Sequence, residues 1–171
     1  MDVMEAIRKR RSIRNYSSKP VEDSKLNLIL ESARIAPSAS NRQEWRFVVV
    51  RDKEKRQKLC EAAKGQKFVG EAPVVIACCA ETNNHVMSCG QLCYPIDVAI
   101  AMTNMTLKAV EEGLGTCWVG AFYEDKVKKT LGIPKDIRVV ELLPLGYPES
   151  VPAEKPKKNL EEIVVYERWT K

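Results

Sequence analysis

The chain has 171 residues, of which 44% are hydrophobic, and a formal net charge of +5 at pH 7. This length suffices for one well-buried core, so we expect a single domain spanning residues 1–171. No apolar run approaches the ~20 residues of a membrane-spanning helix, and the amino terminus lacks the apolar segment of a secretory signal. We therefore expect a cytoplasmic protein with no membrane partner.

The modest positive charge permits nucleic-acid binding without requiring it. Only 6% of residues are aromatic, and they do not alternate with Lys and Arg as in a single-strand binding surface. We therefore expect no nucleic-acid partner. The six cysteines contain no Cys-x-x-Cys pair, so in a reducing compartment we expect buried or free thiols.

Hydrophobic spacing predicts the amino-terminal half of the chain element by element. A short helix begins near Val3 and ends near Ser12, and a second helix runs from about Glu22 to Ile35. A loop rich in small polar residues follows. The strand Arg46 to Val50 and the charged surface helix Asp52 to Ala63 come next.

The carboxyl-terminal half begins with Pro73 to Ala80, a continuous apolar run that predicts a central strand covered on both faces. Asp97 to Glu112 is a long helix that is apolar almost all round, which favours burial in a subunit interface in so small a chain. Asp125 to Leu131 is predicted to be a helix and Arg138 to Gly146 a buried strand. The tail, residues 155–171, ends in apolar side chains that need a surface, either on this domain or on a partner.

The stretch Arg8 to Tyr16 is the most unusual, because it places five cations within seven positions. A charge run is usually a solvated face. However, Ser12 adds a hydroxyl donor, and Arg14 lies two residues further on, so in an extended segment the two side chains share one face. Two interpretations are open at this point: a solvated surface, or a site for an anion such as phosphate.

Three potential metal ligands, His85, Cys89 and Cys93, recur every four residues and would share one face of a helix. Structural zinc takes four ligands, and no fourth is evident nearby. We therefore expect no metal site. The segment Glu81 to Tyr94 is otherwise interpreted as a mobile flap or a short helix.

Four motifs occur in a recognisable order: Arg10 to Arg14, Ala36 to Trp45, Gly113 to Gly120, and Leu143 to Pro148. In sequence and spacing they resemble the FMN-dependent nitroreductase family nearly end to end. The resemblance implies an α+β fold with a mixed central β-sheet flanked by helices. It also implies a homodimer intertwined through the long helix and the tail, with FMN bound on each side of the interface.

The resemblance assigns roles within the basic stretch. Arg10, Arg11 and Ser12 would hold the flavin phosphate and ribityl chain. Arg14 would reach the N1 and O2 edge of the ring, where a fixed guanidinium stabilises the negative charge that a hydride arriving at N5 leaves behind. On this interpretation Arg8 and Lys9 remain solvated.

The remaining assignments come from the other motifs. The backbone at Gly120 and Ala121 would meet N5, and Gln66 would meet the pyrimidine edge. Leu145 and Gly146 would line the ring, and Lys155 and Lys157 would close over the phosphate. A loop would reach the flavin from the partner subunit; its residues are Pro37, Ser38, Ala39, Ser40, Asn41 and Gln43.

This chain departs from the family pattern in three places. Glu44 stands where the family usually has proline, which would add a negative charge near the site entrance. Lysines replace the arginines common in the tail, so point charges rather than bidentate forks would hold the phosphate. Cys89 and Cys93 lie in the segment that varies most within the family, so the resemblance does not identify the substrate.

The expected activity is hydride transfer from NAD(P)H to FMN, followed by two-electron reduction of a nitroaromatic, quinone or similar small-molecule acceptor by a ping-pong mechanism. No side chain in the motifs is an evident general acid. Two alternatives are open. One is a flavin-binding protein without turnover. The other is a reductase that uses ferredoxin, for which the basic surface would suit an acidic carrier.

Overall fold

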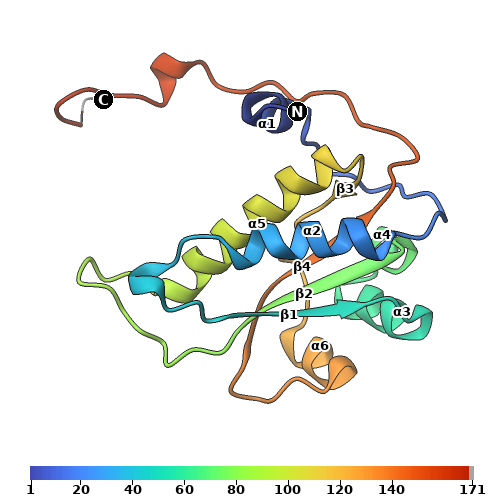
Figure 1. Cartoon of the computed structure of the whole chain (residues 1–171). Coiled ribbons are helices and arrows are strands. Elements are labelled where there is room, and N and C mark those ends of the chain that lie inside the picture. Colours follow the sequence, from blue (N-terminus) through green and yellow to red (C-terminus); the bar gives the residue numbers. More distant parts are fainter. Residues whose placement is uncertain (170–171) are drawn as a thin grey trace.

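The structure, a computed structural model, describes residues 1–169. Its centre is a four-stranded sheet made of β1 (Trp45–Val50), β2 (Val74–Ala80), β4 (Arg138–Gly146) and β3 (Gly115–Thr116), in that spatial order (Figure 1). These strands pair antiparallel. A mixed sheet, with both parallel and antiparallel pairs, was expected. Among the described residues, parallel pairing is limited to the bridge between Ser12 and Thr116. The predicted α+β class is confirmed.

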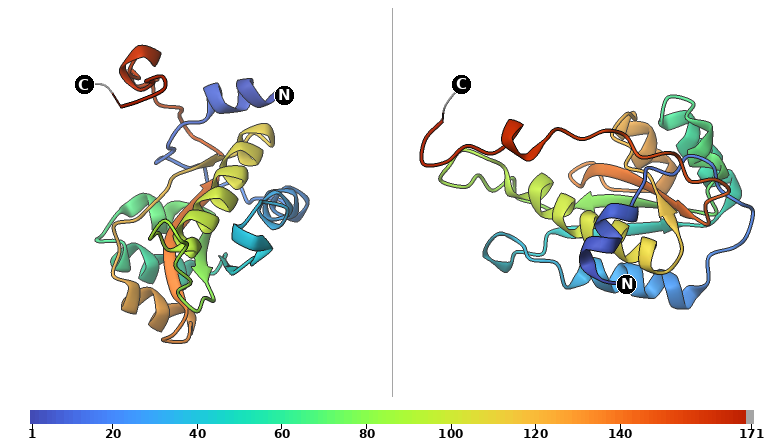
Figure 2. Two further views of the ribbon diagram at one scale, coloured as in Figure 1. Left: turned by 90° about the vertical axis from the view of Figure 1, so that its left-hand side faces the viewer. Right: turned by 90° about the horizontal axis from the view of Figure 1, so that it is seen from above.

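Helices cover both faces of the sheet (Figure 2). One face carries α2 (Asp23–Arg34) and α5 (Cys93–Glu111), and the other carries α3 (Lys53–Ala62), α4 (Lys67–Glu71) and α6 (Glu124–Leu131). All seven residues of β2 are buried, as the continuous apolar run predicts, because this strand has a strand on each side and a helical layer on each face.

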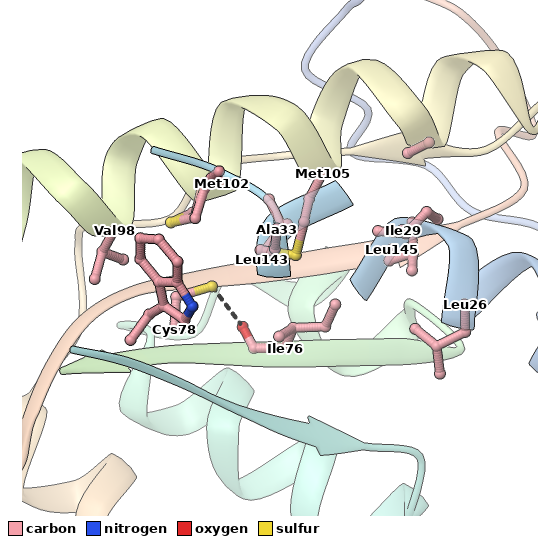
Figure 3. Close-up of a cluster of buried hydrophobic side chains, with 14 of the residues drawn as sticks. Leu26, Ile29, Ala33, Ile76, Cys78, Val98, Met102, Met105, Leu143 and Leu145 are labelled. Carbon is pink, nitrogen blue, oxygen red and sulfur yellow. Dashed lines mark hydrogen bonds between the residues drawn. The ribbon is translucent and has the colours of Figure 1, made fainter. Parts of the chain in front are cut away.

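In the core beneath α2 and α5, side chains of these two helices pack against side chains of β2 and β4 (Figure 3). Ile29 of α2, Met102 of α5 and Leu143 of β4 are each fully buried. Burying one such side chain stabilises the fold by about 1.5–3 kcal/mol. Most of the apolar side chains of α5 are therefore buried within this chain. This core explains the apolar composition of the helix without a subunit interface. Among the large apolar residues of α5, Ile96 is exposed.

The amino-terminal helix α1 (Val3–Lys9) is shorter than predicted. Asp2 caps it by accepting a hydrogen bond from the Glu5 amide at 2.7 Å. The helix ends before Arg10, so the following cations lie on extended chain. Within α1, Val3, Met4 and Ile7 are exposed.

The segment before α5 is neither strand nor helix for most of its length. A bridge joins Val86 to Leu92, and the Cys93 amide donates to the His85 carbonyl at 3.1 Å. Since residues 81–92 form no helix, the helical face that would collect His85, Cys89 and Cys93 does not exist. Within residues 1–169 no three His, Cys, Asp or Glu side chains are grouped to hold a metal ion.

The tail leaves β4, passes beside α1 and extends beyond the domain (Figures 1 and 2). Its apolar side chains are exposed; they are Leu160, Ile163, Val165, Tyr166 and Trp169. These five side chains are not covered by their own domain, and packing of the tail on a partner subunit stays a prediction. Thr170 and Lys171 lie outside the described residues. No helix in the described part of the chain combines the length and apolarity needed to cross a bilayer.

Candidate functional site

The basic stretch is held in an extended conformation against β3. The Ile13 amide donates to the Thr116 carbonyl at 2.9 Å, and Ser12 bridges Thr116 in parallel. Ile13 is buried against Gly115, where a Cβ would collide with the Ile13 side chain. Because extended chain alternates faces, Ser12 and Arg14 point away from this core together, as their spacing predicts.

Two distant segments meet over these residues to form a cavity of about 200 Å³. We call it the cationic cavity, and its charged and hydroxyl-bearing lining residues are Arg8, Arg10, Arg11, Ser12, Arg14, Glu154, Lys155 and Lys157. The structure thus brings together both groups of cations that were assigned to a phosphate. It also includes Arg8, which was expected to remain solvated.

The cations of the cavity differ in what they already contact. Arg11 pairs with Glu154 at 3.1 Å and donates to the carbonyls of Arg8 and Arg10, so its guanidinium is largely committed to the chain itself. Arg10, Lys155 and Lys157, like Arg14, form no ion pair with any residue from 1 to 169. These unpaired cations fit a phosphate group, which carries two charges and several acceptor oxygens.

Cys117 connects the cationic cavity to the next part of the site. Its thiol is buried, donates to the Trp118 carbonyl at 3.6 Å, and lies near Ser12, Arg14 and Arg10. Burial raises the pKa of this thiol, and the nearby cations and the Ser12 hydroxyl offset part of that effect. Cys117 is therefore a neutral, packed residue and a poor nucleophile.

The chain after Cys117 presents exposed backbone at Gly120 and Ala121. Val119 anchors this segment by pairing with Leu142 of β4 at 2.9 and 3.1 Å. Gln66 Nε2 donates to the Ala121 carbonyl at 3.3 Å. Three residues assigned to the flavin ring, Gln66, Gly120 and Ala121, therefore lie together.

Phe68 packs against the buried cluster that contains Ile13 and contacts one cation of the cavity. The Arg14 guanidinium lies over its ring at 5.8 Å from the centroid. Phe68 is on α4, and Gln66 caps the amino terminus of the same helix. Sequence analysis did not single out Phe68, because an isolated aromatic residue beside a short helix carries no pattern.

Glu141 lies directly beneath the Gly120 backbone. A Cβ at Gly120 would be 3.0 Å from Glu141 Oε1 and 3.3 Å from Oε2. The Oε2 atom is sealed from solvent and has no hydrogen-bond partner among the described residues. Burial raises the pKa of this carboxyl. Sequence analysis missed Glu141, although a single acidic residue inside the apolar run of β4 was a usable signal.

The serine-rich loop adopts a backbone that side chains rarely favour. Ser40, Asn41 and Gln43 have φ values of 49°, 55° and 51°. Asp97 Oδ1 accepts the Ala39 amide at 3.1 Å, and Ser38 Oγ accepts the Gln43 amide at 3.1 Å, which hold this conformation. Such maintained strain is typical of ligand-contacting loops.

This loop, residues 37–43, does not line the cationic cavity of its own chain. In Figures 1 and 2 the chain that follows α2 lies far from the segment between α1 and α2. The structure does not bring Pro37, Ser38, Ala39, Ser40, Asn41 or Gln43 to the other assigned residues. Their assignment to a partner's site remains a prediction.

Glu44, which was expected to add a negative charge near the site entrance, is not a free charge, and its position relative to an entrance stays a prediction. The residue is 8% exposed, and its Oε1 pairs with Arg42 Nη2 at 2.7 Å. Arg42 also donates to the Asn83 side chain at 2.8 Å, which fixes the pair between two loops. The carboxylate is therefore compensated within the chain.

Two further assigned residues, Leu145 and Gly146, lie inside the fold. Leu145 is fully buried in the core beneath α5. At Gly146 a Cβ would be 2.5 Å from Pro73 Cδ and 3.1 Å from Tyr16 Cδ1, so glycine is needed for packing. The predicted contact of these two residues with a flavin ring is not tested by these positions.

The fold and the site together define an α+β protein with a cationic cavity beside an exposed backbone turn. The sequence profile of the Nitroreductase family matches residues 7–147, so the chain belongs to this family. An FMN reductase (NAD(P)H) of Bacillus subtilis is 30% identical, covering 95% of this chain and 72% of that protein. An NADH dehydrogenase of Thermus thermophilus is 32% identical, covering 97% of this chain and 96% of that protein. The crystal structure of a nitroreductase family protein from Clostridium difficile superposes with a TM-score of 0.90 at 34% identity, covering 99% of this chain and 100% of that one.

Proposed function

We propose that this protein is an oxidoreductase that uses FMN as its cofactor and NAD(P)H as its reductant. The observation that carries the proposal is the cationic cavity, in which unpaired cations from both ends of the chain converge around Ser12, which bridges Thr116 in the segment that leads to the exposed Gly120 backbone. The names of the Bacillus and Thermus relatives support the same chemistry. FMN supplies the hydride acceptance and two-electron transfer that amino-acid side chains cannot perform.

The residues of this chain bind and orient the cofactor. Arg10, Ser12 and the two lysines Lys155 and Lys157 hold the phosphate by charge and hydrogen bonding. Arg11 contributes chiefly by fixing the tail through Glu154. Because Arg11 holds the tail, Lys155 and Lys157 stay over the phosphate-binding end of the site.

The ring end of the site is served by different groups. Arg14, placed over Phe68, would face the N1 and O2 edge of a bound flavin, where its guanidinium would stabilise negative charge. Gly120 and Ala121 offer backbone to N5, and Gln66 positions that turn from the side. The small residues leave space for a nicotinamide or an acceptor to stack on the ring.

We propose a ping-pong cycle in which the acceptor, a nitroaromatic, quinone or similar small molecule, enters after the oxidised nicotinamide leaves. The nicotinamide and the acceptor would both bind at the exposed turn formed by Gly120 and Ala121. Because they would share this position, they would bind one after the other. Substrate class within this group depends on the variable segment 81–92.

The working unit that we propose is a homodimer. The strained loop at residues 37–43 and the exposed apolar tail both need a surface that their own chain does not provide. In the dimer the loop completes the partner's flavin site, and the tail packs on the partner subunit.

The proposal is tested by titrating purified protein with FMN and following flavin absorbance and fluorescence. We expect one FMN per chain and a yellow protein after removal of free flavin. A protein that remains colourless and leaves the FMN signal unchanged would overturn the proposal.

A further inference from the structure

Glu141 is a half-buried ionisable group of this site that the proposed function leaves unused. It lies on β4 opposite Cys78 of β2, beside a register shift in that strand pair. One carboxylate oxygen is 3.0 Å from the position of a Cβ on Gly120, so the carboxyl lies against the backbone turn assigned to the ring. The other, Oε2, has neither solvent nor a hydrogen-bond partner in the described chain.

The groups that face Glu141 leave its charge uncompensated. Cys78 faces it from β2 and Cys117 from the segment before Gly120, and burial raises the pKa of both thiols, so they are neutral. Arg10 and Arg14 act on Cys117 from the cavity, but neither forms an ion pair with Glu141. A carboxylate in this position has lost part of its water, at Oε2, without gaining a cation, which favours its protonated form.

A purely structural carboxyl of this kind would be expected to accept a hydrogen bond from a nearby amide or hydroxyl. Glu44 and Asp97 also have one buried oxygen without a partner, but the other oxygen of each accepts a hydrogen bond, from Arg42 and from the Ala39 amide respectively. Glu141 Oε2 has no donor, its side chain accepts none of the hydrogen bonds found within residues 1–169, and glycine at position 120 places no side chain between this carboxyl and the turn. Its position therefore suits a group that exchanges a proton.

We propose that Glu141 is the redox-linked proton site of the flavin centre: it binds one proton from solvent when the ring beside Gly120 is reduced, and releases it on reoxidation. The inference rests on the proposed function. A hydride from NAD(P)H delivers two electrons and one proton, and therefore adds one negative charge to the site. That charge repels the nearby carboxylate, and proton binding converts Glu141 to a neutral acid and removes the repulsion. When two electrons leave for the acceptor, the proton dissociates again.

The test is infrared difference spectroscopy of the FMN-loaded protein, reduced minus oxidised, at a pH where the oxidised protein holds Glu141 ionised. The experiment compares unlabelled protein with protein whose glutamate side-chain carboxyls carry ¹³C. We expect a protonated-carboxyl band to gain intensity on reduction, to move with the ¹³C label, and to move in D₂O. E141Q should lack the band, and E149Q, the same change at an exposed residue after β4, should keep it.

A second readout is the midpoint potential of bound FMN as a function of pH. Wild type and E149Q should show an interval of steeper slope, because an extra proton is taken up there, and E141Q should lose that interval. If E141Q does not fold, E141D keeps a carboxyl and should retain a displaced interval, while the ¹³C experiment on wild type needs no variant.

The outcomes separate the two claims. Protein that binds FMN and is reduced by a nicotinamide, but shows no label-sensitive carboxyl band, would overturn the role of Glu141 and leave the proposed function intact. A band that persists unchanged in E141Q would do the same. Protein that fails to bind FMN at all would overturn both.

Discussion

Arg10 and Arg14 lie in one short stretch but have different neighbours, and this difference separates their expected effects. Both line the cationic cavity, but Arg14 also lies over the ring of Phe68. A charge-assisted hydrogen bond is worth about 1.5–3 kcal/mol, so Arg10→Gln should weaken FMN binding by about 10- to 100-fold. Fluorescence titration measures this loss.

Arg14→Ala should instead lower the midpoint potential of bound FMN, because negative charge on the reduced ring loses its cation. A loss of the same free energy corresponds to about 30–60 mV for a two-electron couple. Spectroelectrochemical titration of both variants tests the division. Arg34→Gln, an exposed charge on α2, is the matched control and should change neither quantity. Equal potentials for wild type and Arg14→Ala would contradict the assignment.

Glu141 should also influence the stability of the protein without cofactor. Burial raises its pKa in the folded state above that in the unfolded chain. The folded state therefore binds more protons than the unfolded state between the two pKa values, and stability falls as pH rises through that interval. The urea midpoint of wild type should thus decline relative to that of E141Q as pH rises above about 4.5. A difference that does not vary with pH would contradict the burial of this carboxyl.

At the scale of elements, the pair Arg42 and Glu44 ties the serine-rich loop to β1. Arg42→Gln leaves the buried Glu44 carboxylate without its cation, and we expect a loss of about 1–3 kcal/mol in the free energy of unfolding. The double variant with Glu44→Gln should recover much of this loss, since the orphaned charge is gone. Urea unfolding of the four proteins gives the coupling energy, and strictly additive effects would refute a compensated pair.

The elements differ in how well their sequence predicts them. The apolar run of β2 and the bounds of β4 follow from local patterns, and α2 lies within one residue of its predicted ends. By contrast, α5 begins at Cys93 rather than at Asp97, and residues 81–92 form no helix. These differences arise because the start of α5 is fixed by contacts with the preceding loop, which periodicity does not register.

The features of the site likewise divide into those that local sequence patterns predict and those that they do not. The pairing of Ser12 and Arg14 on one face was predictable from extended geometry. The meeting of Arg10 with Lys155 was available only through family resemblance, since 144 intervening residues carry no local signal. The burial of Glu44 and the position of Glu141 under Gly120 depend on strand register and loop packing, so residue type alone could not reveal them.

At the scale of the whole molecule, the exposed tail is the feature that a single chain does not explain. Trp169 is 86% exposed and Tyr166 is 79% exposed. Deleting residues 159–171 should weaken a homodimer and, with it, the retention of FMN. Sedimentation velocity across a concentration series measures the first effect. Full-length protein with Ile163→Ser and Tyr166→Ser serves as the companion variant, because it keeps the length but loses the apolar contact. An unchanged dimer in both variants would contradict this role.

The most direct test of the central claim is anaerobic mixing of FMN-loaded protein with NADH and, separately, with NADPH while flavin absorbance is recorded. The account predicts rapid loss of the oxidised-flavin absorbance with at least one of them, with one nicotinamide oxidised per flavin. Bound flavin that stays oxidised with both reductants would contradict the account and leave a flavin-binding protein without this turnover, or a reductase served by another electron carrier.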